Sequence, residues 1–266
     1  TLSKRENFSK FSPTHFDYII IDEAHHSEAQ SYQKIIEYFR PTFLLGMTAT
    51  PERTDGEDIY QYFDHNIAYE IRLQEALRED MLCPFHYYGV VDITVNNETI
   101  DENTHFLNLT HEERIKHIIK YINFYGYSGN RVKGLMFVSR NDEAEALSKA
   151  MNKNGFNTIA LSGKNSQEDR ELAIERLTKD DGDLDYIITV DIFNEGVDIP
   201  EVNQIVMLRP TQSAIVFVQQ LGRGLRKDHS KEYLVVIDFI GNYQNNFLIP
   251  IALSGDTSYN KENLKK

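Results

Sequence analysis

Apolar runs of strand length alternate with amphipathic stretches of helix length through the second half of the chain, and this alternation restricts the fold more than any other feature. The apolar runs are residues 134–138, 158–161, 185–190, 204–208 and 233–238. Helical patterns at about 142–152 and 167–177 separate the first three runs, and a further helix is expected between the last two. Strands joined through helices need crossover connections, which make neighbouring strands parallel. The sequence therefore predicts an α/β fold with a parallel sheet.

The first part of the chain carries a shorter version of this pattern, with strands expected at 18–21 and 42–47 and a helix at 31–40 between them. A nucleotide-binding unit of this kind normally begins with a strand and a phosphate-binding loop of the form GxxxxGK[ST], and the sequence has no such loop. Its first glycine is Gly46, which comes after the first expected strand. We therefore expect this part to be the second half of a domain whose first half lies outside this sequence.

A domain boundary is predicted at residue 83. Leu73 begins a short amphipathic helix that Pro84 would stop, and a strand is expected at 85–94. The predicted organisation is the C-terminal part of a first domain at residues 1–83, a complete second domain at 84–255 and a lysine-rich tail at 256–266.

The composition narrows the possible partners and compartments. The chain has 266 residues, of which 41% are hydrophobic and 26% charged, as in ordinary globular proteins. Its apolar runs are much shorter than the roughly 20 residues of a membrane helix, so no membrane partner and a cytoplasmic location are expected. The single cysteine, Cys83, excludes an intrachain disulfide. A formal net charge of −13 means that any contact with nucleic acid must be local.

Two adjacent carboxylates, Asp22 and Glu23, directly follow the apolar run at 18–21. This places them at the carboxyl end of a strand, where doubly wound sheets bind nucleotides. In a nucleoside triphosphatase the first carboxylate would help to hold magnesium and the second would polarise the attacking water. The residues alone also fit an ordinary buried strand that ends in a solvated acidic turn.

Two hydroxyl side chains, Thr48 and Thr50, end the next expected strand. Such hydroxyls can hydrogen-bond the carboxylates of the neighbouring strand and relay a nucleotide-dependent shift to another domain. A threonine-rich turn before Pro51 is the simpler alternative.

The second domain contains two further polar segments. Residues 189–200 follow a buried strand and bring polar groups, a glycine and an acid into one connection, where backbone can approach a ligand closely. Residues 219–226 end a helix and contain Arg223 and Arg226, which can project from one side. A planar, permanently charged guanidinium can neutralise a transferring phosphoryl group, although a solvated helix end would also place arginines there.

Together these segments resemble the motifs of superfamily 2 helicases and translocases over about residues 17 to 240. Residues 22–25 resemble motif II of that superfamily, and residues 48–50 resemble motif III. In the second domain, residues 137–140 resemble motif IV, residues 189–198 motif V and residues 219–226 motif VI. The resemblance implies two RecA-like P-loop NTPase domains with parallel sheets, the first incomplete and the second complete, which clamp ATP and Mg²⁺ between them.

Within the superfamily, residues 48–53 and 222–226 look most like the branch that contains the type III Res subunit and other restriction-enzyme motor subunits. Leu225 stands where many relatives carry a glycine, which favours this branch. Motors of this branch act on double-stranded DNA, so duplex DNA is the more strongly implied partner, with additional nuclease or specificity domains or subunits outside this sequence.

The resemblance also implies roles at the nucleotide. Asp22 would hold magnesium, and Glu23 would be the base that orients water. Arg223 and Arg226 would reach the phosphates from the second domain, and His25 would couple the site to the threonine and arginine motifs. The other residues implied at the bound nucleotide are Gly196, Asp198 and Gln219.

A track for the nucleic-acid backbone is implied at the motifs of the second domain. Its residues would be Ser139, Arg140, Ser162, Gly163 and Thr189. Their hydroxyls, backbone N–H groups and charge suit phosphate contacts, which carry no base preference. Arg140 as a plain surface arginine is the alternative.

The expected function is the motor core of an ATP-dependent DNA helicase or translocase, with closure about a hinge near Cys83 and Pro84. Without the phosphate loop, the 266-residue chain itself is expected to be inactive. Two alternatives remain open: an RNA helicase, and a non-catalytic RecA-like module that binds nucleic acid or regulates another protein.

Overall fold

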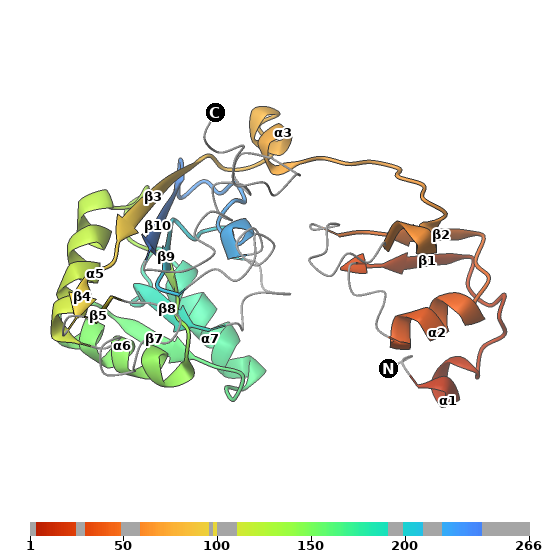
Figure 1. The fold of residues 1–266 in the computed structure, drawn as a ribbon, viewed down its shortest axis with the longest axis horizontal. Helices are drawn as coiled ribbons and strands as arrows, with labels where there is room; N and C mark the ends of the chain where they lie inside the picture. The colour runs from red at the N-terminus through yellow and green to blue at the C-terminus, as the bar shows by residue number, and fades with distance from the viewer. Residues whose placement is uncertain are drawn as a thin grey trace. The chain divides into compact units, whose positions relative to one another are not determined.

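The computed structural model describes residues 4–24, 30–48, 59–95, 98–99, 111–190, 199–209 and 220–240. It divides the chain into two units, residues 1–71 and 72–266, and each has its own parallel sheet (Figure 1). The predicted α/β fold with parallel sheets is confirmed. Among the helices in these ranges, none combines the length and apolarity needed to cross a lipid bilayer.

The first unit is built around two parallel strands. Its elements are α1 (Arg5–Phe8), β1 (Tyr18–Ile21), α2 (Gln30–Tyr38), β2 (Phe43–Gly46) and the 3-10 helix η2 (Ile59–Phe63). β1 and β2 pair in register from Tyr18 opposite Phe43 to Ile21 opposite Gly46. A Cβ atom at Gly46 would overlap the ring of Phe63, so the glycine allows η2 to pack directly on β2.

The second unit contains a six-stranded parallel sheet in the order β3-β10-β9-β6-β8-β7. Its strands are β3 (Phe85–Val91), β6 (Gly134–Phe137), β7 (Thr158–Leu161), β8 (Tyr186–Thr189), β9 (Gln204–Met207) and β10 (Leu234–Ile240). Its helices are α3 (Leu73–Arg78), α5 (Glu112–Tyr125), α6 (Asn141–Lys153) and α7 (Gln167–Thr178). A short antiparallel pair, β4 (Thr94–Val95) and β5 (Glu98–Thr99), follows β3.

Both faces of this sheet are covered. Successive residues of β6 and the residue after it point to opposite faces, with Leu135 and Phe137 in one apolar cluster and Met136 and Val138 in the other. α5 and α6 contribute to the second cluster, whereas α7 contributes to the first together with Ile199, Val202, Leu221 and Leu225. A strand buried on both faces reads as a continuous apolar run, which is why the sequence identified these strands well.

The segment that enters the second unit differs from the prediction in two ways. The structure separates the units after Ile71, whereas the sequence places the boundary at residue 83. The physical reason is that Leu73 and Leu82 pack against the core of the second unit and Cys83 is buried there. The strand expected at 85–94 ends at Val91. The helix expected between the last two strands falls mostly on residues 210–219, outside the described residues.

α3 ends earlier than predicted, through a turn of the Schellman type. The N–H of Met81 donates to the carbonyl of Ala76 (2.8 Å), and the N–H of Asp80 donates to that of Leu77 (3.2 Å). Asp80 adopts the left-handed conformation at φ 54° that this motif requires. The predicted stop at Pro84 is therefore wrong, because the helix has already ended at Arg78.

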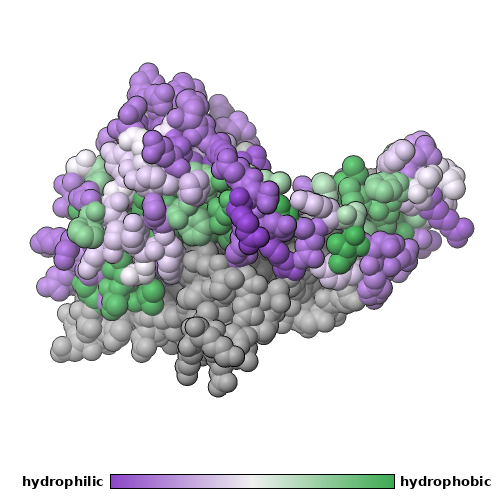
Figure 2. Space-filling view, turned by 90° about the horizontal axis from the view of Figure 1, so that it is seen from above, coloured by the Kyte–Doolittle hydropathy of each residue, from purple (hydrophilic) through white to green (hydrophobic). Residues whose placement is uncertain are grey.

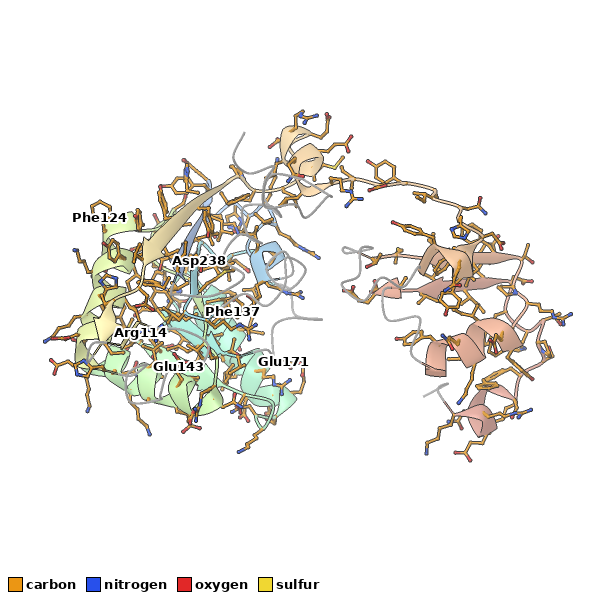
Figure 3. The ribbon with its side chains drawn as sticks, in the orientation of Figure 1. Arg114, Phe124, Phe137, Glu143, Glu171 and Asp238 are labelled. Carbon is orange, nitrogen blue, oxygen red and sulfur yellow. The ribbon has the colours of Figure 1, made fainter. Side chains whose placement is uncertain are left out.

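A buried carboxylate, Asp238, lies on β10 and accepts a hydrogen bond from the hydroxyl of Tyr87 on β3 (2.7 Å). Figure 3 labels Asp238 in the second unit. Burial raises the pKa of Asp238 from 3.8 to about 6, although the bond from Tyr87 opposes the shift. The folded state therefore holds its proton more tightly than the unfolded state. Stability from this group is fully present below about pH 4 and is lost as the pH rises through about 6.

We expect Asp238→Asn to be more stable than the wild type above pH 6, by up to about 3 kcal/mol, with the difference vanishing near pH 4. Urea unfolding of the second unit as a function of pH measures this. Asp183→Asn is the matched control, because a hydrogen bond from Arg176 lowers the pKa of Asp183 and the control should lose stability instead. Parallel pH curves for Asp238→Asn and the wild type would contradict the assignment.

Candidate nucleotide and nucleic-acid sites

The first unit brings Asp22 and Glu23 next to the segment that begins at Thr48, which we call the threonine segment, at the carboxyl ends of its two strands. The N–H of Ala24 donates to the carbonyl of Met47 (2.8 Å), and the N–H of Met47 donates to that of Ile21 (2.9 Å). These bonds extend the pairing of β1 and β2 past the ends of both strands. Asp22 is exposed and Glu23 half-buried, and Thr48 follows Met47 directly. His25 and Thr50 lie outside the described residues.

The backbone of Glu23 is strained. Its φ is 50°, in the left-handed region that residues other than glycine, asparagine and aspartate seldom adopt. The turn is held on both sides: the N–H of Glu23 donates to Asp22 Oδ1 (3.0 Å), and Ala24 is buried and bonded to β2. Such strain persists only where neighbouring contacts enforce it, and it concentrates at functional sites. The turn therefore marks the carboxylate pair as the strongest candidate for chemistry in this unit.

In the second unit the two arginines lie in what we call the arginine segment, residues 222–226. Arg223 is half-buried and Arg226 exposed. Between them, Gly224 is buried so tightly that a Cβ atom would lie 2.7 Å from Leu234 Cδ1. The side chain of Leu225, the departure from the glycine of many relatives, is buried in the core. Gln219 lies outside the described residues.

The loop after β6 holds Ser139 and Arg140. The N–H of Ser139 donates to Glu143 Oε2 (3.0 Å). Arg140 forms a two-point ion pair with Asp142, with its Nε 2.9 Å from Oδ1 and its Nη2 2.7 Å from Oδ2. Both side chains are about half exposed. A phosphate could therefore replace Asp142 as the partner of Arg140 at little cost.

The loop after β7 holds Ser162 and Gly163. The N–H of Ser162 donates to Asn165 Oδ1 (2.8 Å), and a Cβ atom at Gly163 would meet no neighbour within 4 Å. Arg170 of α7 donates to the carbonyls of both loop residues, at 3.4 and 3.3 Å. The loop is therefore shaped by its own contacts and leaves the backbone of Gly163 accessible.

Thr189 differs from the other residues of the predicted track, because its side chain is fully buried at the end of β8. Its hydroxyl has no hydrogen-bond partner within the part of the chain that the structure describes. In this conformation the hydroxyl cannot contact a nucleic acid, which would require Thr189 to become exposed. Gly196 and Asp198 belong to the segment after β8 and lie outside the described residues.

A buried ionic cluster that the motifs did not reveal supports the loop after β6. Arg114 of α5 contacts Asp92 (2.9 Å) and Glu143 (3.2 Å), and its Nη2 donates to the carbonyl of Leu208 (3.2 Å). Figure 3 shows Arg114 and Glu143 on α5 and α6 of the second unit. Burial raises the pKa of Glu143, although Arg114 opposes the shift. The cluster joins segments at the carboxyl ends of β3, β6 and β9.

One sequence signal could have found this cluster. Arg114 lies four residues before Ile118 and eight before Ile122, on the same buried face of α5. A charged residue in a buried stripe must have partners. Nothing in the sequence identifies Asp92 as one of them.

Comparison with known proteins shows that the segments carrying these sites are shared with helicases and restriction enzymes. The family model described as the res subunit of type III restriction enzymes matches residues 1–53, and the helicase conserved C-terminal domain matches residues 113–228. A Saccharomyces cerevisiae protein provisionally named ATP-dependent helicase IRC3 is 30% identical over 244 residues, which are 87% of this chain and 35% of the relative. The endonuclease subunit of the Escherichia coli type I restriction enzyme EcoAI is 25% identical over 271 residues, covering 87% of this chain and 32% of that subunit.

Two solved structures share the fold. One is a fragment of a provisionally assigned HsdR subunit of a type I restriction enzyme from Vibrio vulnificus YJ016, with a TM-score of 0.68, 24% identity, and coverage of 87% of this chain and 45% of that one. The other is the type ISP restriction-modification enzyme LlaBIII bound to DNA, with a TM-score of 0.63, 18% identity, and coverage of 88% of this chain and 18% of that one. Both identify the fold as RecA-like.

The chain therefore belongs to the superfamily 2 helicases. Within that superfamily it is of the type found in restriction-enzyme motor subunits. It spans only about a third of the length of the yeast and bacterial relatives.

The cluster around Arg114 leads to a stability prediction. Arg114→Met leaves two buried carboxylates without their cation, so the free energy of unfolding should fall by about 3–5 kcal/mol. Adding Asp92→Asn and Glu143→Gln to this variant should recover most of the loss, because no buried charge then remains. Chemical denaturation measures both variants. Arg140→Met, which removes an exposed ion pair, is the control and should change stability little.

Proposed function

We propose that this chain is part of the ATP-driven motor of a DNA helicase or translocase. The observation that carries the proposal is the turn at residues 22–24, where two carboxylates follow a strand, one of them in a strained conformation, beside the threonine segment. A solvated acidic turn would need neither the strain nor the bond to the next strand. Membership of the superfamily and the two arginines of the second unit support the same reading.

The residues present fit magnesium. Asp22 is an exposed carboxylate that directly follows β1. Mg²⁺ in nucleotide sites is commonly bound through one or two carboxylates, with water and phosphate oxygens completing its shell. Asp22 would therefore act on the magnesium shell.

Glu23 would accept a proton from the attacking water and orient it, and the strained turn would keep its carboxylate at the sheet edge. Arg223 and Arg226 would neutralise charge on the phosphates. ATP supplies the phosphoryl group that is transferred. Thr48, together with His25 and Thr50, would relay to the second unit whether nucleotide is bound at the carboxylate turn. The residues that would contact the nucleotide from the second unit are Gly196, Asp198 and Gln219.

We further propose that the intact protein carries a preceding segment with the phosphate loop. Tyr18 is 72% exposed, Ile20 61% and Phe43 48%, so one face of the two-stranded sheet presents apolar side chains. Figure 2 shows hydrophobic side chains on the surface of this unit. A two-stranded sheet is at best marginally stable alone and is stabilised by further strands or by helices packed against it. The greater length of the relatives supports this proposal.

The nucleic-acid track would be local, as the net charge of −13 requires. Ser139, Arg140, Ser162 and Gly163 lie in loops at the carboxyl ends of β6 and β7. Thr189, at the end of β8, would join them only if its buried side chain became exposed. Duplex DNA is the proposed partner because the chain resembles restriction-enzyme motors. An RNA helicase is the second candidate, supported by a relative named as an ATP-dependent RNA helicase of Yarrowia lipolytica, PRP28. A module without catalysis would have no physical need for the strained carboxylate turn.

The 266-residue chain by itself should not hydrolyse ATP above background, because it has no phosphate loop to hold the phosphates of ATP. A coupled phosphate-release assay measures this, and addition of the preceding segment should restore activity. Turnover by the chain alone would overturn the fragment proposal.

In the intact protein, Glu23→Gln should retain nucleotide and lose turnover by about 10² to 10⁴, as expected for a lost general base. Arg223→Ala should cut turnover by about 10³ or more with a smaller effect on nucleotide binding. The control is Arg176→Ala, which removes an exposed arginine paired with Asp183. The proposed function fails if both site variants keep normal turnover, and stronger stimulation by RNA than by duplex DNA would favour the second candidate.

A further inference from the structure

The polypeptide that enters the second unit is hydrogen-bonded to the arginine segment. The N–H of Cys83 donates to the carbonyl of Leu225 (2.6 Å). The adjacent carbonyl, that of Gly224, accepts a hydrogen bond from Lys231 Nζ (2.7 Å). Lys231 Nζ also donates to the carbonyl of Val202 (2.6 Å), in the loop before β9. Two successive carbonyls between Arg223 and Arg226 are thus held from two sides.

Burial makes these bonds strong. Lys231 is 7% exposed, and both Cys83 and Leu225 are 2% exposed. A buried ammonium is costly unless it is hydrogen-bonded, and bonds from a charged donor are about twice as strong as neutral ones. Removal of the ammonium would leave two buried carbonyls without this donor, and a buried acceptor that loses its donor is destabilising.

The same contact extends along the linker. Leu73 and Leu82 pack against the core cluster that contains Leu221 and Leu225. Asp80 forms an ion pair with Lys227 (2.6 Å), just after the arginine segment. This exposed pair adds little energy, but it shows that the linker follows the arginine segment from α3 to β3.

We infer that the bond from Cys83 to Leu225 locks the arginine segment to residues 72–84, and that Lys231 is a positioning residue that keeps this bond in place by holding the adjacent carbonyl of Gly224. Arg223 and Arg226 then move together with this part of the linker. The hinge between the units then lies before α3, in residues 66–72, which form neither helix nor strand. This differs from the hinge expected near Cys83 and Pro84, because both residues are fixed to the second unit. The link to catalysis rests on the proposed function of the arginines.

The sole cysteine of the chain provides a direct test. Burial raises the pKa of the Cys83 thiol, so alkylation by iodoacetamide should be slow in the folded wild type. Lys231→Met keeps a flexible stem of similar length but has no donor, and it should speed alkylation at least about tenfold. Loss of the Lys231 charge alone would slow the reaction, because that charge lowers the thiol pKa. Faster alkylation therefore reports release of the linker.

The chain offers a matched control. Lys133 is as deeply buried, at 3% exposed, and its ammonium contacts Asp180 (2.9 Å), which lies outside residues 72–84. Lys133→Met should leave the rate of Cys83 alkylation near the wild-type value when the variants are compared at equal stability. Equal acceleration in both variants, or none in Lys231→Met, would overturn the lock.

In the intact protein, Lys231→Met should lower kcat at least about tenfold with little change in the KM for ATP, whereas Lys231→Arg, which keeps a charged donor, should retain most activity. Unchanged kcat in Lys231→Met would overturn the positioning role. If the intact protein shows no ATPase activity at all, the proposed function fails while the alkylation result still decides whether the lock exists.

Discussion

The parallel hydrogen-bond ladder of the second unit is the constraint on which its other features depend. It continues beyond the strands: the N–H of Val138 donates to the carbonyl of Thr189 (3.0 Å), and the N–H of Leu208 donates to that of Phe137 (2.8 Å). Because all six strands run in one direction, their carboxyl ends meet at one edge. Segments far apart in the sequence, such as the loops that begin at Ser139 and Ser162, therefore start from the same edge of the sheet. The first unit uses the same device with two strands, where it joins the carboxylate turn to the threonine segment.

Buried charged side chains connect helices and loops that the hydrogen bonds between strands do not reach. Arg114 joins α5 to α6 and to the ends of two strands, and Lys231 joins the arginine segment to the loop before β9. Such groups add little net stability compared with apolar residues of the same shape, whereas removing one partner is costly. Their value here is positional, because each holds a loop that carries a candidate functional residue.

Much of the architecture could be predicted from local pattern. The strands at 18–21 and 158–161 match the prediction, and the ends of α6 and α7 lie within one residue of theirs. Apolar runs mark the strands, and the spacing of apolar residues along one buried face marks the helices. The end of α3 could not be predicted from Pro84, since a left-handed aspartate ended the helix first. The boundary between the units was also placed too late, because the packing of Leu73 and Leu82 on a distant core has no local signature.

The sequence by itself determined the α/β class, the parallel order implied by its crossovers, and the position of two carboxylates at a strand end. These features follow from residues close together in the chain. Tertiary structure alone decided that Glu23 is strained, that burial raises the pKa of Asp238, and that Lys231 reaches the carbonyl of Gly224. Backbone conformation, desolvation and hydrogen-bond partners depend on neighbours that are brought together only when the sheet forms, so no pattern along the chain can encode them locally.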